Sequence, residues 1–168
     1  MKKTALLAFV AFFLASSCAI SYKFNGASID YSKVRTIAII DFTNQATLVY
    51  PPLISSFNES LKDSYSKQTR LEFTKRNGDL NIEGEITGYS LTPLAVGSDA
   101  YAAETRLTLT ARVRFTNNTN HEEDFERTFS ANRTFSSTST FESVQDQLVT
   151  ELIDEIVEGI YNATVANW

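Results

Sequence analysis

Three arginines on one predicted strand are the residues whose type and spacing best support chemistry. In residues 104–115 the odd positions are apolar from 107 onward, and Arg106, Arg112 and Arg114 occupy even positions. A strand with this period of two places all three guanidinium groups on one face. Because a guanidinium group donates paired hydrogen bonds to phosphate, the face could bind a phosphate-bearing ligand. The alternative is a cross-strand ion pair, such as Arg112 with Glu83, which contributes about 0.2 to 1 kcal/mol.

The single cysteine, Cys18, follows a short apolar segment at the start of the chain. Lys2 and Lys3 precede an apolar run at 5–14, and the small residues 15–17 lead to the cysteine. This arrangement is typical of a secretory signal, and the run is too short to span a bilayer. The cysteine position resembles the lipobox of bacterial lipoproteins. We therefore expect a signal peptide at 1–17 and a lipid anchor, with acyl chains such as palmitate, on Cys18; a free or buried thiol is the alternative.

The mature chain is acidic and long enough for one domain. The sequence holds 15 basic and 20 acidic residues, and Lys2 and Lys3 lie in the predicted signal peptide. An acidic balance disfavours nucleic acid as a partner. Residues 18–168 suit a single domain with its own core. Ala19 follows the cysteine without an acidic run, which by resemblance to lipoprotein sorting rules predicts an outer-membrane location, lipid-anchored on the periplasmic side.

Residues for common catalytic routes are scarce. The one histidine, His121, stands in a polar turn beside three acids at 122–124, which favours a surface histidine over a metal ligand. The sequence contains no glycine-rich phosphate loop, nucleophile elbow or zinc-protease helix motif. We therefore interpret the protein as a non-enzyme that needs no metal or cofactor.

Hydrophobic periodicity predicts the elements that position these residues. In chain order they are a buried strand at 34–42, a helix at 53–68, strands at 71–74, 82–89, 104–115 and 125–135, and a helix at 141–160. Asn77-Gly78 marks a turn, and residues 91–103 connect two strands. The order predicts an α+β fold, a two-layer sandwich with two α-helices packed on one face of a four- to five-stranded mixed β-sheet.

Two strands contain residues that interrupt their patterns. Gly84 and Gly88 share the expected inner face of 82–89, which predicts a bulge or the close approach of another segment, such as a helix. Arg127 and Arg133 share the parity of apolar residues in 125–135. A bulge that swaps faces, or arginines that snorkel at the sheet ends, would explain the second pattern.

The order of these segments resembles the LptE family of lipopolysaccharide-assembly lipoproteins. The resemblance covers nearly the whole mature chain and rests on the lipobox at Cys18, the strand Thr36–Asn44, the helix after Tyr50-Pro51-Pro52, the pattern Ile82-x-Gly84-x-Ile86-x-x-Tyr89 ahead of Pro93, and the acidic C-terminal helix. It implies two helices on a four-stranded mixed sheet, in agreement with the fold predicted from periodicity.

The resemblance also implies partners. Members of this family are expected to sit inside the outer-membrane β-barrel LptD, to assist its assembly and to help lipopolysaccharide reach the outer leaflet. Lipopolysaccharide contact is attributed to basic side chains on the sheet and its loops, and strand geometry favours Arg106, Arg112 and Arg114. The alternative is a structural or adaptor lipoprotein of another periplasmic secretion or transport complex. A periplasmic hydrolase is a third hypothesis.

Overall fold

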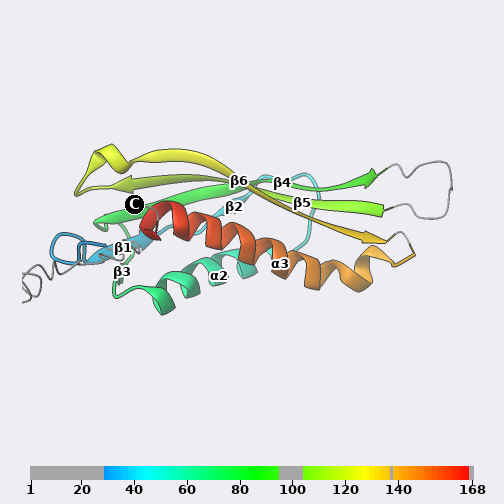
Figure 1. Ribbon diagram of the computed structural model, residues 1–168, viewed down its shortest axis with the longest axis horizontal. Helices are drawn as coiled ribbons and strands as arrows, with labels where there is room; N and C mark the ends of the chain where they lie inside the picture. The colour runs from blue at the N-terminus through cyan, green and yellow to red at the C-terminus, as the bar shows by residue number, and fades with distance from the viewer. Residues whose placement is uncertain (1–28, 95–103, 137, 167–168) are drawn as a thin grey trace, which may run out of the picture.

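The computed structural model in Figure 1 describes residues 29–94, 104–136 and 138–166. The predicted signal peptide at 1–17 and the predicted anchor Cys18 lie outside these residues. The elements in chain order are β1 (Thr36–Ile39), β2 (Thr43–Asn44), α2 (Pro52–Gln68), β3 (Glu72–Thr74), β4 (Leu80–Leu94), β5 (Glu104–Asn117), η1 (His121–Glu123), β6 (Phe125–Ser136), α3 (Phe141–Tyr161) and η2 (Asn162–Ala166).

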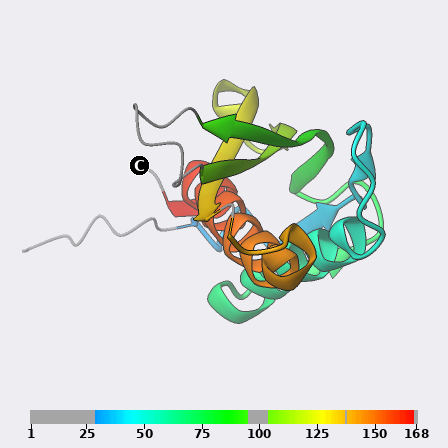
Figure 2. The same ribbon diagram turned by 90° about the vertical axis from the view of Figure 1, so that its right-hand side faces the viewer.

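The sheet is mixed and lies over a layer of two helices. Its strand order is β3-β1-β4-β5-β6, and β2 pairs with β4 as well. Strand β1 runs parallel to β3 and β4, whereas β4, β5 and β6 are antiparallel. Figures 1 and 2 show α2 and α3 side by side on one face of the sheet. The predicted two-layer α+β sandwich is therefore confirmed.

The described residues form six strands, more than the four or five predicted, because the chain forms the short strand β2 just past the predicted strand at 34–42. After β1 the chain turns toward α2, where the backbone nitrogen of Phe42 donates to Asn58 Oδ1 at 2.8 Å. The Phe42 ring packs 5.0 Å from the Phe57 ring of the same helix. The chain then returns to the sheet as β2, which pairs with Glu85 and Ile86.

The core lies between the sheet and the helices. Helix α2 buries Leu53, Phe57, Leu61 and Tyr65, four residues apart, as amphipathic periodicity predicts. Helix α3 buries Leu148, Val149, Leu152, Ile153, Ile156, Val157 and Ile160. Within the described ranges, neither helix combines the length and apolar character that a membrane crossing requires.

Strand β4 differs from its prediction in length and in the orientation of its second half. The pairing with β5 shifts between Ile86 and Gly88, so one extra residue bulges out. Past the bulge Tyr89 is buried and Gly88 lies on the opposite face, although the alternation predicted the reverse. The strand also continues through Pro93, within the segment predicted as a connection. Because β2 pairs only with Glu85 and Ile86, Pro93 lies where β4 has no second described neighbour, a position that tolerates proline.

Gly84 confirms the predicted close approach, but its neighbours are strand β5 and Phe42 and not a helix. A Cβ on Gly84 would lie 2.3 Å from the carbonyl oxygen of Arg112 and 2.5 Å from the Phe42 ring. A Cβ on Gly78 would lie 2.7 Å from the backbone nitrogen of Ala38, because the connection from β3 to β4 crosses β1. The side-chain amide of Asn81 exchanges hydrogen bonds with Gly78 at 3.1 and 2.9 Å, which holds the crossing in place.

Candidate functional site

The sheet face away from the helices, here called the outer face, carries the predicted arginine set. Along β5 the residues Leu107, Leu109, Ala111, Val113 and Phe115 are buried. Their even-numbered neighbours, including Arg106, Arg112 and Arg114, therefore project from the outer face. The alternation predicted for this strand is confirmed.

Arg112 and Arg114 lie together and each faces an acid on β4. Arg112 stands opposite Glu85, and Arg114 stands opposite Glu83. The predicted pairing of Arg112 with Glu83 is therefore wrong by two residues. The described ends of the two strands pair Leu94 with Glu104, a later register than a turn centred at Gly97 and Ser98 would give.

Three carboxylates surround the two guanidinium groups. Arg114 Nη1 lies 3.2 Å from Glu83 Oε1, and its Nη2 lies 3.3 Å from Glu126 Oε2. Arg112 donates to Glu85, and its Nε lies 3.9 Å from Glu126 Oε1. The hydrogen bond to Glu85 is the main cause that raises the pKa of Arg112. A shallow groove of about 490 Å³ opens here. The acidic side chains in its lining outnumber the basic ones, so its net charge is negative.

Arg106 does not join this cluster. Arg112 lies six positions further along the strand, which is about 20 Å. Arg106 faces Thr92 on β4 and Thr134 on β6, and among the described residues no carboxylate lies within salt-bridge distance of it. The surrounding outer face carries hydroxyl and amide groups from Ser90, Thr92, Thr108, Thr110, Ser130, Asn132, Thr134 and Ser136. The three predicted arginines share one face but form two separate sites.

The arginines that interrupted the β6 pattern lie on the helix side of the sheet. The β5–β6 pairing keeps one register throughout, so no bulge swaps the faces. Arg133 Nε lies 3.0 Å from Glu151 Oε2, and its Nη1 lies 2.6 Å from Glu155 Oε2 on α3. Arg127 lies 4.6 Å over the Phe125 ring. Sequence reasoning missed the Arg133 pairing, although two acids four residues apart on α3 were a visible signal.

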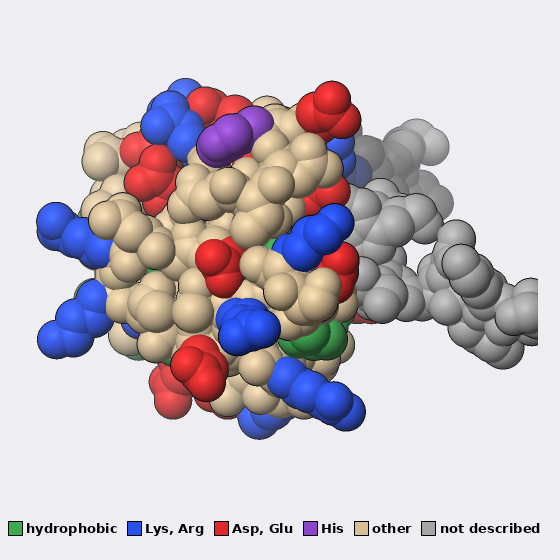
Figure 3. All heavy atoms as spheres, turned by 90° about the vertical axis from the view of Figure 1, so that its left-hand side faces the viewer, with side chains coloured by type: hydrophobic (Ala, Val, Ile, Leu, Met, Phe, Trp, Pro, Cys, Tyr) green, Lys and Arg blue, Asp and Glu red, His purple; other side chains and the backbone are tan. Residues whose placement is uncertain are grey.

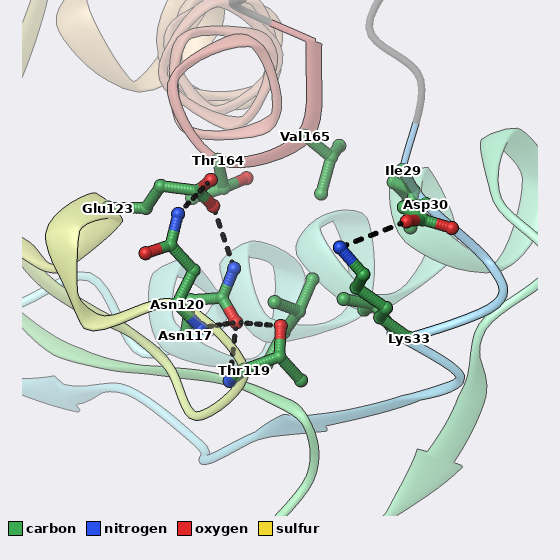
Figure 4. A pocket seen from close by; sticks show the side chains of 11 residues that line it. Ile29, Asp30, Lys33, Asn117, Thr119, Asn120, Glu123, Thr164 and Val165 are labelled. Atoms are coloured by element: carbon green, nitrogen blue, oxygen red, sulfur yellow. Dashed lines mark hydrogen bonds and ion pairs between the residues drawn. The ribbon is translucent and has the colours of Figure 1, made fainter.

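A cavity of about 300 Å³ lies at the end of the sandwich, between the entering chain, the β5–β6 turn and η2 (Figure 4). Asn117 and Thr164 are the buried polar residues that line it. Asn117 Nδ2 donates to Glu123 Oε2 at 2.7 Å, and Thr164 Oγ1 donates to the carbonyl oxygen of Ile160 at 2.9 Å. Asn117 therefore holds the β5–β6 turn, and Thr164 holds the end of α3. Both polar groups are bonded within the protein.

The turn that contains the single histidine is structural as well. His121 Nδ1 lies 3.0 Å from Asp124 Oδ2, and both side chains reach the surface. The backbone nitrogen of Asn117, which donates to Asp124, is the main cause that lowers the pKa of this carboxyl. In the part of the chain that the structure covers, no three histidine, cysteine or acidic side chains are grouped to hold a metal.

Comparisons with known proteins agree with this architecture. A family model described as LptE, lipopolysaccharide-assembly, matches residues 34–164. No curated protein matches the chain. The solution structure of uncharacterized lipoprotein B from Nitrosomonas europaea is 13% identical with a TM-score of 0.55, over 76% of this chain and 79% of that chain. A hypothetical protein from Chlamydia trachomatis is 12% identical with a TM-score of 0.50, over 78% of this chain and 98% of that chain. Both solved structures share the fold.

Proposed function

This chain belongs to the LptE family of lipopolysaccharide-assembly proteins, and on that premise we propose that it works at the outer membrane as the lipoprotein partner of a large LptD-type β-barrel. The observation that carries the proposal is the family match over residues 34–164, which spans every element from β1 to α3. The predicted anchor on Cys18 would fix the domain to the periplasmic side of that membrane. Each buried methylene of an acyl chain contributes about 0.8 kcal/mol, so several chains hold a protein firmly.

The outer face suits a position inside such a barrel. Large transmembrane barrels have a polar lumen, so a plug needs a surface that keeps its hydrogen-bonding groups satisfied in polar surroundings. The hydroxyl-rich half of the outer face around Thr108 and Ser130 offers such groups on rigid strands. The apolar residues of β5 are buried against the helices, so the domain can fill space without exposing its core. In this role the sandwich assists the barrel by shape and hydrogen bonding.

Lipopolysaccharide contact is proposed for the three arginines of the outer face. Arg106 has no acid directly opposite and can meet a phosphate without rearrangement. Arg112 and Arg114 must exchange a carboxylate for a phosphate, and their exposed positions allow this exchange. Both steps are binding steps, so the proposed mechanism makes and breaks no covalent bond and needs no cofactor.

Purification from native membranes tests the proposal. The tagged full-length chain, extracted in mild detergent, is expected to leave the outer membrane in a stable complex with one very large β-barrel protein. Mass measurement of the mature chain should show acylated Cys18 as its first residue, and a Cys18→Ala variant should lack the acyl mass. A chain that purifies with a periplasmic secretion or transport complex instead would support the adaptor alternative and contradict the barrel proposal.

A further inference from the structure

Cationic side chains without salt bridges gather at one edge of the sheet, around β3. Arg35, Arg70, Lys75 and Arg76 are exposed, and none forms a salt bridge with a residue that the structure describes. Figure 3 views this end of the molecule and shows Lys and Arg side chains spread over it, with acidic side chains between them. We call these four residues, with the exposed aromatic residues Tyr31 and Phe73, the β3 rim.

The acids near the rim do not cancel its positive charge. Asp79 Oδ2 accepts hydrogen bonds from the backbone nitrogens of Arg35 and Thr36 at 2.8 and 2.9 Å. The hydrogen bond from the Arg35 backbone is the main cause that lowers the pKa of Asp79. This carboxylate therefore accepts hydrogen bonds from the backbone at the start of β1. Glu72 is the other acid at this edge. Glu83 lines a groove together with Arg76 but is paired with Arg114. The four cations of the rim therefore outnumber the acids beside them.

Two aromatic side chains at the rim are exposed. Tyr31 is 40% exposed and Phe73 is 44% exposed. Exposed aromatic residues beside basic residues are typical of surfaces that lie at a lipid headgroup layer.

The rim also lies where the chain enters the domain. The backbone nitrogen of Arg70 donates to Tyr31 Oη at 3.3 Å, which places the entering segment against the start of β3. Ten residues, 19–28, separate the described domain from Cys18. Ten extended residues span at most about 33 to 36 Å, so the proposed anchor would hold this end within that distance of the membrane surface.

The helix layer carries the opposite charge. Helix α3 contains six acids and no Lys or Arg: Glu142, Asp146, Glu151, Asp154, Glu155 and Glu158. Arg133 pairs with two of them, Glu151 and Glu155. An anionic surface therefore repels the α3 side and attracts the β3 rim, so electrostatics favour one orientation of the domain.

We propose that the β3 rim binds the anionic phospholipid headgroups of the membrane leaflet that holds the anchor, and so orients the domain for its partner. The proposal rests on the lipid anchor of the proposed function, and it adds a protein surface that touches lipid directly. Arg35, Arg70, Lys75 and Arg76 supply the charge, and Tyr31 and Phe73 supply apolar contact. Binding should weaken with salt, because the attraction extends about one Debye length.

Vesicle flotation tests this surface. The probe is the whole mature chain with Cys18→Ser, which removes the acyl anchor, mixed with phosphatidylcholine vesicles that contain or lack phosphatidylglycerol. We expect binding to the phosphatidylglycerol vesicles only, with a loss of about fivefold for each basic residue removed. Arg70→Gln combined with Arg76→Gln should therefore weaken binding about 30-fold. The matched control, Lys62→Gln combined with Arg127→Gln, removes the same charge elsewhere and should retain binding.

Other outcomes overturn the inference. Equal binding to both vesicle types, or equal loss in the rim and control variants, would show that the rim does not select anionic phospholipid. Binding to vesicles that contain lipopolysaccharide but not to those with phosphatidylglycerol would assign the rim to the transported lipid instead. Co-purification with the barrel does not depend on these results, so a failure here and a failure of the proposed function can be told apart.

Discussion

The guanidinium groups of Arg112 and Arg114 are held by carboxylates before any ligand arrives. Glu83 and Glu85 face them across β4, and Glu126 reaches both from β6. Such exposed pairs are weak and are screened by salt. The pairs therefore compete with a phosphate ligand without excluding it, and they keep the side chains extended along the outer face.

This competition predicts that removing the acids strengthens lipopolysaccharide binding. Glu83→Gln combined with Glu85→Gln removes one carboxylate partner from each arginine and leaves only Glu126 between them. A titration with lipopolysaccharide should show affinity higher by about two- to fivefold for each carboxylate removed. Arg112→Gln combined with Arg114→Gln should weaken binding. The control, Glu142→Gln combined with Glu158→Gln, makes the same charge change on α3 and should leave affinity within twofold. If both the acid and the arginine variants bind like the parent chain, the ligand does not contact this pair.

At the scale of elements, the crossing from β3 to β4 shows what local sequence reasoning misses. Asn77-Gly78 was predicted as a turn, and Asn77 does adopt a positive φ of 54°. The turn does not join neighbouring strands, because β1 lies between β3 and β4 and is parallel to both. The glycine is needed where the backbone passes over Ala38, and the amides of Asn81 and Asn118 bond to its carbonyl oxygen at 2.9 and 2.7 Å.

The crossing predicts different costs for two glycine substitutions. Gly78→Ala places a methyl group against rigid backbone atoms of Ala38 and Leu80, so the free energy of unfolding should fall by about 2 to 3 kcal/mol. Gly88→Ala meets only the Thr110 side chain at 3.3 Å and should cost less than about 1 kcal/mol. Urea unfolding of both variants measures the difference. Equal costs would mean that β1 and the crossing segment separate more easily than their packing indicates.

For the whole molecule, the sequence predicted what depends on local pattern. Period-two and helical repeats located the strands and helices, because burial of one face is visible in each segment alone. Three other features depend on distant segments. They are the register of β4 with β5, the reversal of faces past the bulge after Ile86, and the pairing of Arg133 with α3. One bulged residue reverses every side chain that follows it, which moved Tyr89 into the core. The arginine face was predictable from its own strand, whereas its acidic partners were not.

Tyrosines at the seam between the helices and the sheet predict that the whole domain loses stability in alkali. Tyr65 is fully buried and bonds to Thr164, and burial is the main cause that raises its pKa. Its pKa in the unfolded chain is about 10, so above that pH the unfolded state loses its proton first and the free energy of unfolding falls as pH rises.

Tyr65→Phe should remove up to about 1.4 kcal/mol per pH unit from this slope, and should cost about 1 kcal/mol at neutral pH for the lost hydrogen bond. Urea unfolding from about pH 8 to about pH 11 measures the slope. The control Phe57→Leu changes a buried residue that does not titrate, so it should lower the free energy of unfolding at every pH and keep the slope. An unchanged slope in Tyr65→Phe would show that ionisation of Tyr65 is not coupled to unfolding.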